Sequence, residues 1–239
     1  MRRATLAAVG AAAALAVASS GTAHAIGGGA EAKTSPSSVV YVGPNRCSGA
    51  LIAAQWVLTA RHCVVPDTAN FAVHRNEPEP VAITVDKTYL APFSDMALLH
   101  LSTEAAGANI LGGDKGSNGY IPLDGDASIP AHDTAVTLMG YAGGTLKAGE
   151  AKVSKSNTIQ NMEATAQAAG ALTGYAEPGD SGGPILRKDS NGQLALIGII
   201  SGGGGPPTSR WTGGGSLWQT DGKGGTMTLR QWIRDTSGI

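Results

Sequence analysis

The most informative segment of the sequence is Gly179-Asp180-Ser181-Gly182-Gly183-Pro184, taken together with the positions of the histidines along the chain. Glycines on both sides of Ser181 let the backbone turn sharply and bring amide N–H groups close to a bound oxygen atom. A serine hydroxyl becomes a nucleophile when a neighbouring base accepts its proton. Ser181 is therefore a candidate nucleophile, and an ordinary glycine-rich surface turn is the alternative.

Residues 179–183 also fit the G-x-S-x-G elbow of α/β-hydrolases, in which the catalytic histidine follows the serine in the chain. None of the histidines of this sequence follows Ser181, so the α/β-hydrolase interpretation fails. The histidines are His24, His62, His74, His100 and His132.

His62 is the candidate base, because it follows a strand-like run and adjoins Cys63, which a disulfide would hold in place. The candidate orienting acid is Asp95, which precedes the apolar run Met96–Leu101. A carboxylate at the edge of such a run is shielded from water and can orient a histidine. A solvated turn is the alternative for Asp95, and the other histidines are interpreted as ordinary polar side chains. The other carboxylates considered were Asp67, Asp86 and Asp114.

Cys47 and Cys63 are the two cysteines of the sequence. In an exported protein an isolated pair is more typical of a disulfide than of a zinc site, which requires four ligands. We expect a disulfide between them, no metal site and no cofactor.

Residues 1–25 are typical of an export signal. Arg2-Arg3 forms a positive end, Leu6–Val17 is a short apolar run, and Ala23-His24-Ala25 is an A-x-A cleavage pattern. The apolar run is shorter than the ~20 residues of a membrane-spanning helix, and twin-arginine export is an alternative route. We expect a secreted, extracellular protein that begins at Ile26.

The charge balance argues against nucleic-acid and membrane partners. The formal net charge of −1 becomes −3 when the two arginines of the signal are removed. A weakly acidic surface has no basic patch for nucleic acid or for an anionic membrane.

The chain carries 35 glycines, and short apolar runs alternate with turn-forming clusters. This pattern predicts an all-β fold in two halves, joined by a linker at Gly112–Gly119 and followed by a helix at Thr228–Thr236. The predicted strands are Ser38–Val42, Ala50–Leu58, Val81–Val85, Met96–Leu101, Ala135–Gly140, Ile185–Leu186, Leu194–Ser201 and Ser216–Gln219.

These motifs together resemble the trypsin/chymotrypsin family of serine peptidases. The resemblance rests on Cys47–Ile52, Trp56–Cys63, Asp95–Leu99 and Gly179–Pro184, in the family's order of histidine, aspartate and serine. Ala176-Glu177-Pro178 is similar to the small secreted bacterial members. The resemblance implies two six-stranded antiparallel β-barrels packed together, with a short C-terminal helix. Residues 26–118 would form the barrel that carries His62 and Asp95, and residues 119–239 the barrel that carries Ser181, plus the helix.

The resemblance also implies the chemistry. His62, held by Asp95, would accept the proton of Ser181, and the amides of Gly179 and Ser181 would form the oxyanion hole. The expected protein is a secreted serine endopeptidase, a monomer that acts on polypeptides. The alternatives are a catalytically silent relative that binds a partner, and a secreted esterase with the same triad.

Two further roles follow from the resemblance. The amine of Ile26, freed by cleavage after Ala25, would pair with Asp180 and order the oxyanion loop, although Gly27 stands where the family usually has a β-branched residue. Tyr175 stands where trypsins carry the acidic floor of the specificity pocket. Ser201, Gly202 and Gly203 match the strand that pairs with the substrate backbone. We therefore expect a preference for small or apolar side chains before the cut.

Overall fold

The structure is a computed structural model that describes residues 25–32, 37–74, 80–107, 119–126, 128–157, 162–169 and 171–239. Most of the predicted export signal (1–24) and most of the predicted linker (112–118) lie outside these ranges. Within the described ranges, no helix has the length and apolar character needed to cross a membrane.

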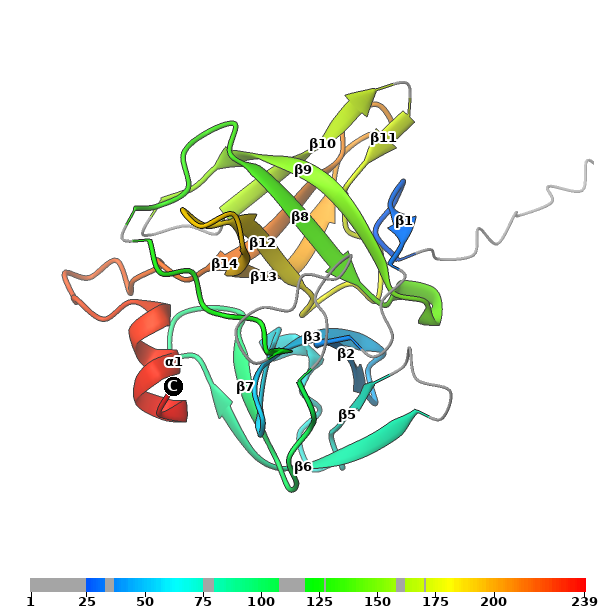
Figure 1. The fold of residues 1–239 in the computed structure, drawn as a ribbon. Coiled ribbons are helices and arrows are strands. Elements are labelled where there is room, and N and C mark those ends of the chain that lie inside the picture. The colour runs from blue at the N-terminus through cyan, green and yellow to red at the C-terminus, as the bar shows by residue number, and fades with distance from the viewer. Residues whose placement is uncertain are drawn as a thin grey trace, which may run out of the picture.

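Six antiparallel strands form a closed barrel in the first half of the chain, in the order β2-β3-β4-β7-β6-β5. Figure 1 shows this barrel below the second one. Its strands are β2 (Val39–Gly43), β3 (Cys47–Ala53), β4 (Trp56–Thr59), β5 (Phe71–His74), β6 (Val81–Leu90) and β7 (Ala97–Leu101).

The second half of the chain, together with the two-residue strand β1 near the N-terminus, forms an eight-stranded antiparallel sheet in the order β1-β9-β8-β12-β13-β14-β10-β11. Pairing of β9 with β10 closes six of its strands into a second barrel, and β1 and β11 pair at its margins. The predicted fold of two six-stranded antiparallel barrels is therefore confirmed. The strands are β1 (Ala30–Glu31), β8 (Ala135–Gly140), β9 (Lys147–Lys155), β10 (Met162–Ala169), β11 (Ala171–Thr173), β12 (Pro184–Lys188), β13 (Leu194–Gly204) and β14 (Trp211–Ser216).

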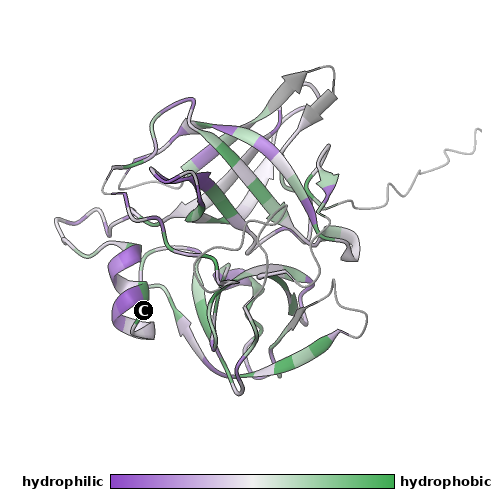
Figure 2. Ribbon diagram, viewed as in Figure 1, coloured by the Kyte–Doolittle hydropathy of each residue, from purple (hydrophilic) through white to green (hydrophobic). Residues whose placement is uncertain are grey.

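The apolar side chains of the strands gather inside the barrels. Leu51, Leu58 and Leu98 are fully buried in the first barrel, and Leu138 and Ile199 in the second. Figure 2 shows this as green stretches along the barrel strands. Burial of a large aliphatic side chain contributes about 1.5–3 kcal/mol to folding, so such positions supply much of the driving force.

The predicted C-terminal helix is present as α1 (Leu229–Ser237). The Thr228 side chain caps it by accepting a hydrogen bond from the Gln231 amide at 3.1 Å. Leu229 and Ile233 are buried, as the helical spacing of the apolar residues predicts. Gly238 ends the helix in the left-handed conformation that glycine adopts readily.

Two strand predictions were wrong in detail. The run Ala50–Leu58 is not one strand but parts of β3 and β4, joined at residues 54–55, where neither glycine nor proline marks the turn. The predicted strand Ser216–Gln219 lies too late in the sequence, because the strand in this region is β14, which pairs with β13 and β10 and ends at Ser216. Its run of three glycines carries none of the side chains that identify a strand in a sequence.

Candidate active site

His62 and Asp95 lie on neighbouring elements of the first barrel. His62 belongs to a single 3-10 turn, Arg61–Cys63, which begins two residues after the end of β4, and Asp95 lies two residues before the start of β7. Pairing of β4 with β7 brings the two segments together. The His62 amide donates to Asp95 Oδ1 at 2.9 Å, and its ring nitrogen Nδ1 lies 2.6 Å from Asp95 Oδ2. A proton on Nδ1 leaves Nε2 as a free acceptor, which is the tautomer that a general base requires.

The Asp95 carboxylate is stabilised in its charged form. Partial burial is the largest influence on its pKa and acts to raise it. The hydrogen bonds from the Ser201 hydroxyl and from the His62 ring and amide together outweigh burial, so the pKa of Asp95 lies below its ordinary 3.8. At neutral pH the side chain is an anion that can hold a protonated imidazole.

The side chain of Ser201 forms a contact that the sequence does not predict. Its hydroxyl donates a hydrogen bond to Asp95 Oδ2 from β13 of the second barrel. The side chain of Ser201 therefore links the two barrels through Asp95. This contact is compatible with the predicted pairing of Ser201 with a substrate, because that pairing would use the backbone of Ser201 and not its hydroxyl.

The Ser181 loop packs against the first barrel close to His62. The Ser48 amide donates to the Ser181 carbonyl oxygen at 2.7 Å, and the Gly182 amide donates to the Ile200 carbonyl at 2.7 Å. Gly182 has a positive φ of 83°, and a Cβ at this position would lie 2.1 Å from the Thr59 hydroxyl. Only glycine fits so close to the first barrel in that conformation. Ser181 is thereby held beside the segment that leads into His62.

The backbone around Gly179 fits the predicted oxyanion hole. Gly179 has a positive φ of 106°, which glycine tolerates without strain. Among the hydrogen bonds formed by the described residues, none has the amide of Gly179 or Ser181 as its donor. Both predicted donors are thus uncommitted within the described part of the chain.

Ser48 is a positioning residue that the sequence reasoning missed. Its buried hydroxyl donates to the Gly179 carbonyl at 2.9 Å and accepts from the Tyr141 amide at 2.9 Å. Its own carbonyl accepts from the Thr59 hydroxyl at 2.7 Å. Ser48 thus connects β3, the serine loop and the end of β8. No local pattern marks it, because its partners are far away in the sequence.

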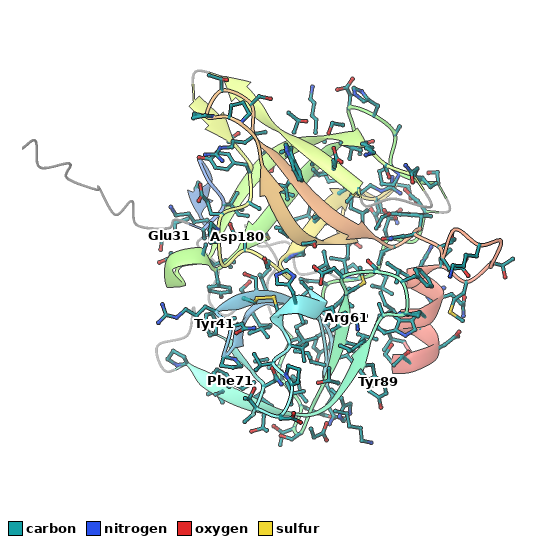
Figure 3. All side chains as sticks on the ribbon, turned by 180° about the vertical axis from the view of Figure 1, so that it is seen from behind. Glu31, Tyr41, Arg61, Phe71, Tyr89 and Asp180 are labelled. Atoms are coloured by element: carbon teal, nitrogen blue, oxygen red, sulfur yellow. A yellow bond between two sulfur atoms is a disulfide. The ribbon has the colours of Figure 1, made fainter. Side chains whose placement is uncertain are left out.

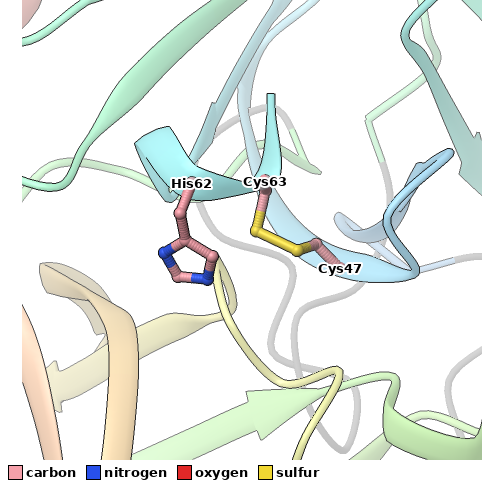
Figure 4. Close-up of side chains that lie close together, drawn as sticks. All are labelled: Cys47, His62 and Cys63. Carbon is pink, nitrogen blue, oxygen red and sulfur yellow. A yellow bond between two sulfur atoms is a disulfide. The ribbon is translucent and has the colours of Figure 1, made fainter. Parts of the chain in front are cut away.

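Cys47 and Cys63 form the predicted disulfide, with Cα atoms 5.9 Å apart. Their sulfur atoms and a ring nitrogen of His62 lie within 4.8 Å of one another, a spacing that could suit a metal ion. Disulfide sulfurs carry no thiolate charge, so the cluster is not a metal-binding set. Figure 4 shows the disulfide beside the turn and the His62 imidazole extending from that turn towards the second barrel.

The side chain of Asp180 is fully buried and accepts hydrogen bonds from three backbone nitrogens. Its Oδ2 accepts from the Ile26 backbone nitrogen at 2.9 Å and from the Glu177 amide at 2.8 Å, and its Oδ1 accepts from Ala142 at 3.2 Å. Burial, the dominant influence, raises the pKa of Asp180 to about 6 despite these hydrogen bonds. Figure 3 shows Asp180 at the junction of the two barrels, close to the N-terminal strand.

The predicted specificity residues lie on two facing segments. The Ala176 amide donates to the Thr212 hydroxyl of β14 at 2.8 Å, and Thr212 is fully buried. A Cβ on Gly203 would lie 3.4 Å from Ala176 Cβ, whereas one on Gly202 would meet nothing within 4 Å. The Tyr175 ring packs against Gly27. The segment 175–177 is therefore in direct contact with β13 and β14.

This fold and the order of its motifs are those of the trypsin-like peptidases. A family model described as Trypsin matches residues 26–214, and the chain belongs to that family. A protein named "Uncharacterized peptidase" from Corynebacterium glutamicum (strain R) is 30% identical over 169 residues, which cover 68% of this chain and 55% of that protein.

Two animal proteins are similar at lower identity. "Transmembrane protease serine 11C" of Mus musculus is 25% identical over 211 residues, covering 75% of this chain and 48% of that protein. "Serine protease Hayan" of Drosophila melanogaster is 28% identical over 199 residues, covering 68% of this chain and 31% of that protein. The chain spans about half the length, or less, of these curated relatives.

Proposed function

We propose that this protein is a secreted serine endopeptidase that hydrolyses polypeptides through Ser181, His62 and Asp95. The observation that carries the proposal is the bond between His62 Nδ1 and the ionised Asp95, beside the loop that carries Ser181. This bond leaves Nε2 as the acceptor for the serine proton. A catalytically silent relative is the rival, and the retention of all three side chains argues against it.

The proposed reaction proceeds through an acyl-enzyme. Ser181 Oγ attacks the peptide carbonyl carbon while His62 Nε2 accepts its proton, and the amides of Gly179 and Ser181 hold the resulting oxyanion. Collapse of the intermediate breaks the C–N bond, and His62 returns the proton to the leaving amine. Water then attacks the acyl group with His62 again as the base. Loss of one oxyanion donor typically costs about 10²–10³ in kcat.

We propose that cleavage after Ala25 both completes export and activates the enzyme. Ile26, a β-branched residue, has a positive φ of 36°, a strained conformation for such a side chain. The angle φ is defined by the preceding carbonyl carbon, so breaking the Ala25–Ile26 bond removes the strain. The new ammonium would then pair with Asp180, a buried carboxylate for which the described residues provide no other cation.

We propose a preference for small side chains before the scissile bond. The resemblance gives Tyr175 as the floor of the pocket that takes this side chain and residues 201–203 as the strand that pairs with the substrate backbone, so we place this pocket between segment 175–177 and the strands β13 and β14. The hydrogen bond between Ala176 and Thr212 and the contact of Ala176 with Gly203 support a shallow pocket, because they hold these segments together.

A digest of a mixed peptide library tests the proposal and separates it from the esterase alternative. The wild-type protein, beginning at Ile26, is expected to cut internal peptide bonds after small residues, and the Ser181→Ala variant is expected to cut none. Cleavage of esters with no peptide cleavage would favour the esterase. No turnover of either class would overturn the proposal.

A further inference from the structure

Tyr175, which precedes the serine loop in the sequence, contacts the N-terminal segment of the chain at Gly27. The Gly27 amide donates to the Tyr175 carbonyl at 2.7 Å, and the two residues form an isolated antiparallel β-bridge. Side chains of such a pair lie on the same face. The Tyr175 ring covers Gly27: a Cβ on Gly27 would lie 2.0 Å from Cε2, 2.1 Å from Cζ and 2.6 Å from Cδ2 of the ring. The ring therefore occupies the space that a side chain at position 27 would need.

Arg210 also contacts this ring. Its guanidinium carbon lies 5.4 Å from the centroid of the Tyr175 ring, within the range of a cation–π interaction. Arg210 immediately precedes β14, and its carbonyl accepts from the Ala166 amide at 2.9 Å. The backbone of Arg210 is thus anchored to β10, so its side chain extends over the ring from a fixed strand.

Gly27, which the ring covers, is the neighbour of Ile26, the residue whose nitrogen contacts Asp180. Ile26 contacts Asp180 through its nitrogen, and its side chain packs so closely on β9 that a Cβ on Gly149 would lie 2.6 Å from Ile26 Cγ2. The Gly29 amide donates to the Ile26 carbonyl at 2.8 Å. The N-terminal segment is therefore held at Ile26 by the packing of its side chain on β9, and at Gly27 by Tyr175.

We propose that Tyr175 and Arg210 form an aromatic clamp that holds the segment 26–29 in place and so keeps the nitrogen of Ile26 on Asp180. Tyr175 is then a positioning residue that acts through Ile26 and Asp180, and Gly27 is required because the ring fills its side-chain space. The link between the clamp and catalysis rests on the proposed function, whereas the clamp itself does not.

The clamp is tested first by a double-mutant cycle in kcat/KM on the protein that begins at Ile26. Gly27→Val is expected to lower kcat/KM at least tenfold, because the new side chain displaces the ring. The double variant Gly27→Val/Tyr175→Ala is expected to be no less active than Tyr175→Ala alone, because both substitutions remove the same clamp. Tyr175→Phe keeps the ring and is expected to keep the alkaline limb of the pH profile at its wild-type position. Gly125→Val is the control for a glycine substitution, because a Cβ there would meet nothing within 4 Å.

The alkaline limb of the pH profile distinguishes the clamp from a merely structural role. If the clamp favours the inserted ammonium of Ile26 tenfold over the released amine, the apparent pKa for deprotonation of this ammonium rises by one unit. Tyr175→Ala and Arg210→Gln are therefore expected to move the alkaline limb to lower pH by up to one unit, with the folded fraction unchanged by circular dichroism. An unmoved limb in both variants would contradict the proposal.

Hydrogen exchange tests the clamp without reference to activity. The Gly27 amide is expected to exchange at least tenfold faster in Tyr175→Ala than in the wild type, and at the wild-type rate in Tyr175→Phe and Gly125→Val. Unchanged exchange in Tyr175→Ala overturns the clamp even if the enzyme is active. Faster exchange in a protein without peptidase activity supports the clamp and rejects the proposed function instead.

Discussion

The backbone nitrogen of Ile26 lies 2.9 Å from Oδ2 of Asp180, across 154 residues of sequence and next to the candidate nucleophile. Both residues are fully buried. This contact links the start of the expected mature chain to the loop that would bind the oxyanion. In the proposed activation, the chemical state of this nitrogen, amide or ammonium, determines the activity.

One added residue before Ile26 is expected to lower kcat/KM by tenfold or more. The extension replaces the ammonium by an amide, which leaves the charge of Asp180 without a cation. The measurement compares the chain that begins at Ile26 with the chain that carries one extra alanine. Full activity of the extended chain would refute the proposed activation.

The stability of the uncleaved chain is expected to fall as pH rises from about 4 to about 6. The pKa of Asp180 is about 6 in the folded protein, against an ordinary value of 3.8. Within this window the folded chain binds a proton that the unfolded chain does not, so the free energy of unfolding decreases with rising pH, by about 3 kcal/mol in total. Urea unfolding at several pH values measures the slope.

Asp180→Asn is the control for this pH dependence, because the amide does not titrate. The slope is expected to flatten in that variant and also in the cleaved wild type, where the ammonium of Ile26 lowers the pKa of Asp180. The same slope in Asp180→Asn as in the uncleaved wild type would assign the effect to other groups.

Ser48→Ala is expected to reduce both stability and activity. The substitution leaves the buried Tyr141 amide without its acceptor, at a cost of about 1–3 kcal/mol. It also frees the Gly179 carbonyl, and hence the adjoining oxyanion amide, so kcat is expected to fall more than KM rises.

Thr228→Ala is the matched control for Ser48→Ala. It removes the α1 cap at a cost of about 1 kcal/mol, far from the candidate site, and is expected to leave kcat unchanged. Equal effects of the two substitutions on kcat would show that Ser48 acts only through stability.

Thr212→Gly is expected to broaden the specificity towards large apolar residues before the cut, by tenfold or more in kcat/KM. The substitution removes the side chain that holds segment 175–177 against β14. Thr212→Ser keeps the hydroxyl and is expected to preserve the preference for small residues. Library digests of the three proteins give the comparison, and identical profiles would contradict the role assigned to Thr212.

The fold class and the candidate triad could be proposed from the sequence because their signals are local. Each candidate residue stands in a short motif, and the absence of histidine after Ser181 distinguishes two unrelated folds without any structure. The helix α1 was predictable for the same reason, since its apolar spacing and its Thr228 cap lie within one stretch.

The remaining features depend on contacts between distant segments. Ser48 acts through Gly179, 131 residues away, and Ser201 reaches Asp95 across the two barrels. Gly27 departs from the family's usual residue in the sequence, and Tyr175 stands at an unusual position. The structure relates the two departures, because the ring of one fills the side-chain space of the other. No spacing rule within the sequence could reveal that relationship.

Reaction with a serine-directed phosphonate shows whether Ser181 is an activated nucleophile, on which the proposed function depends. The protein that begins at Ile26 is incubated with the reagent, and the modified peptide is located by mass spectrometry. The account predicts one phosphonyl group on Ser181, with labelling abolished in Ser181→Ala and strongly slowed in His62→Ala. An unlabelled Ser181 in the folded wild-type protein would contradict the account.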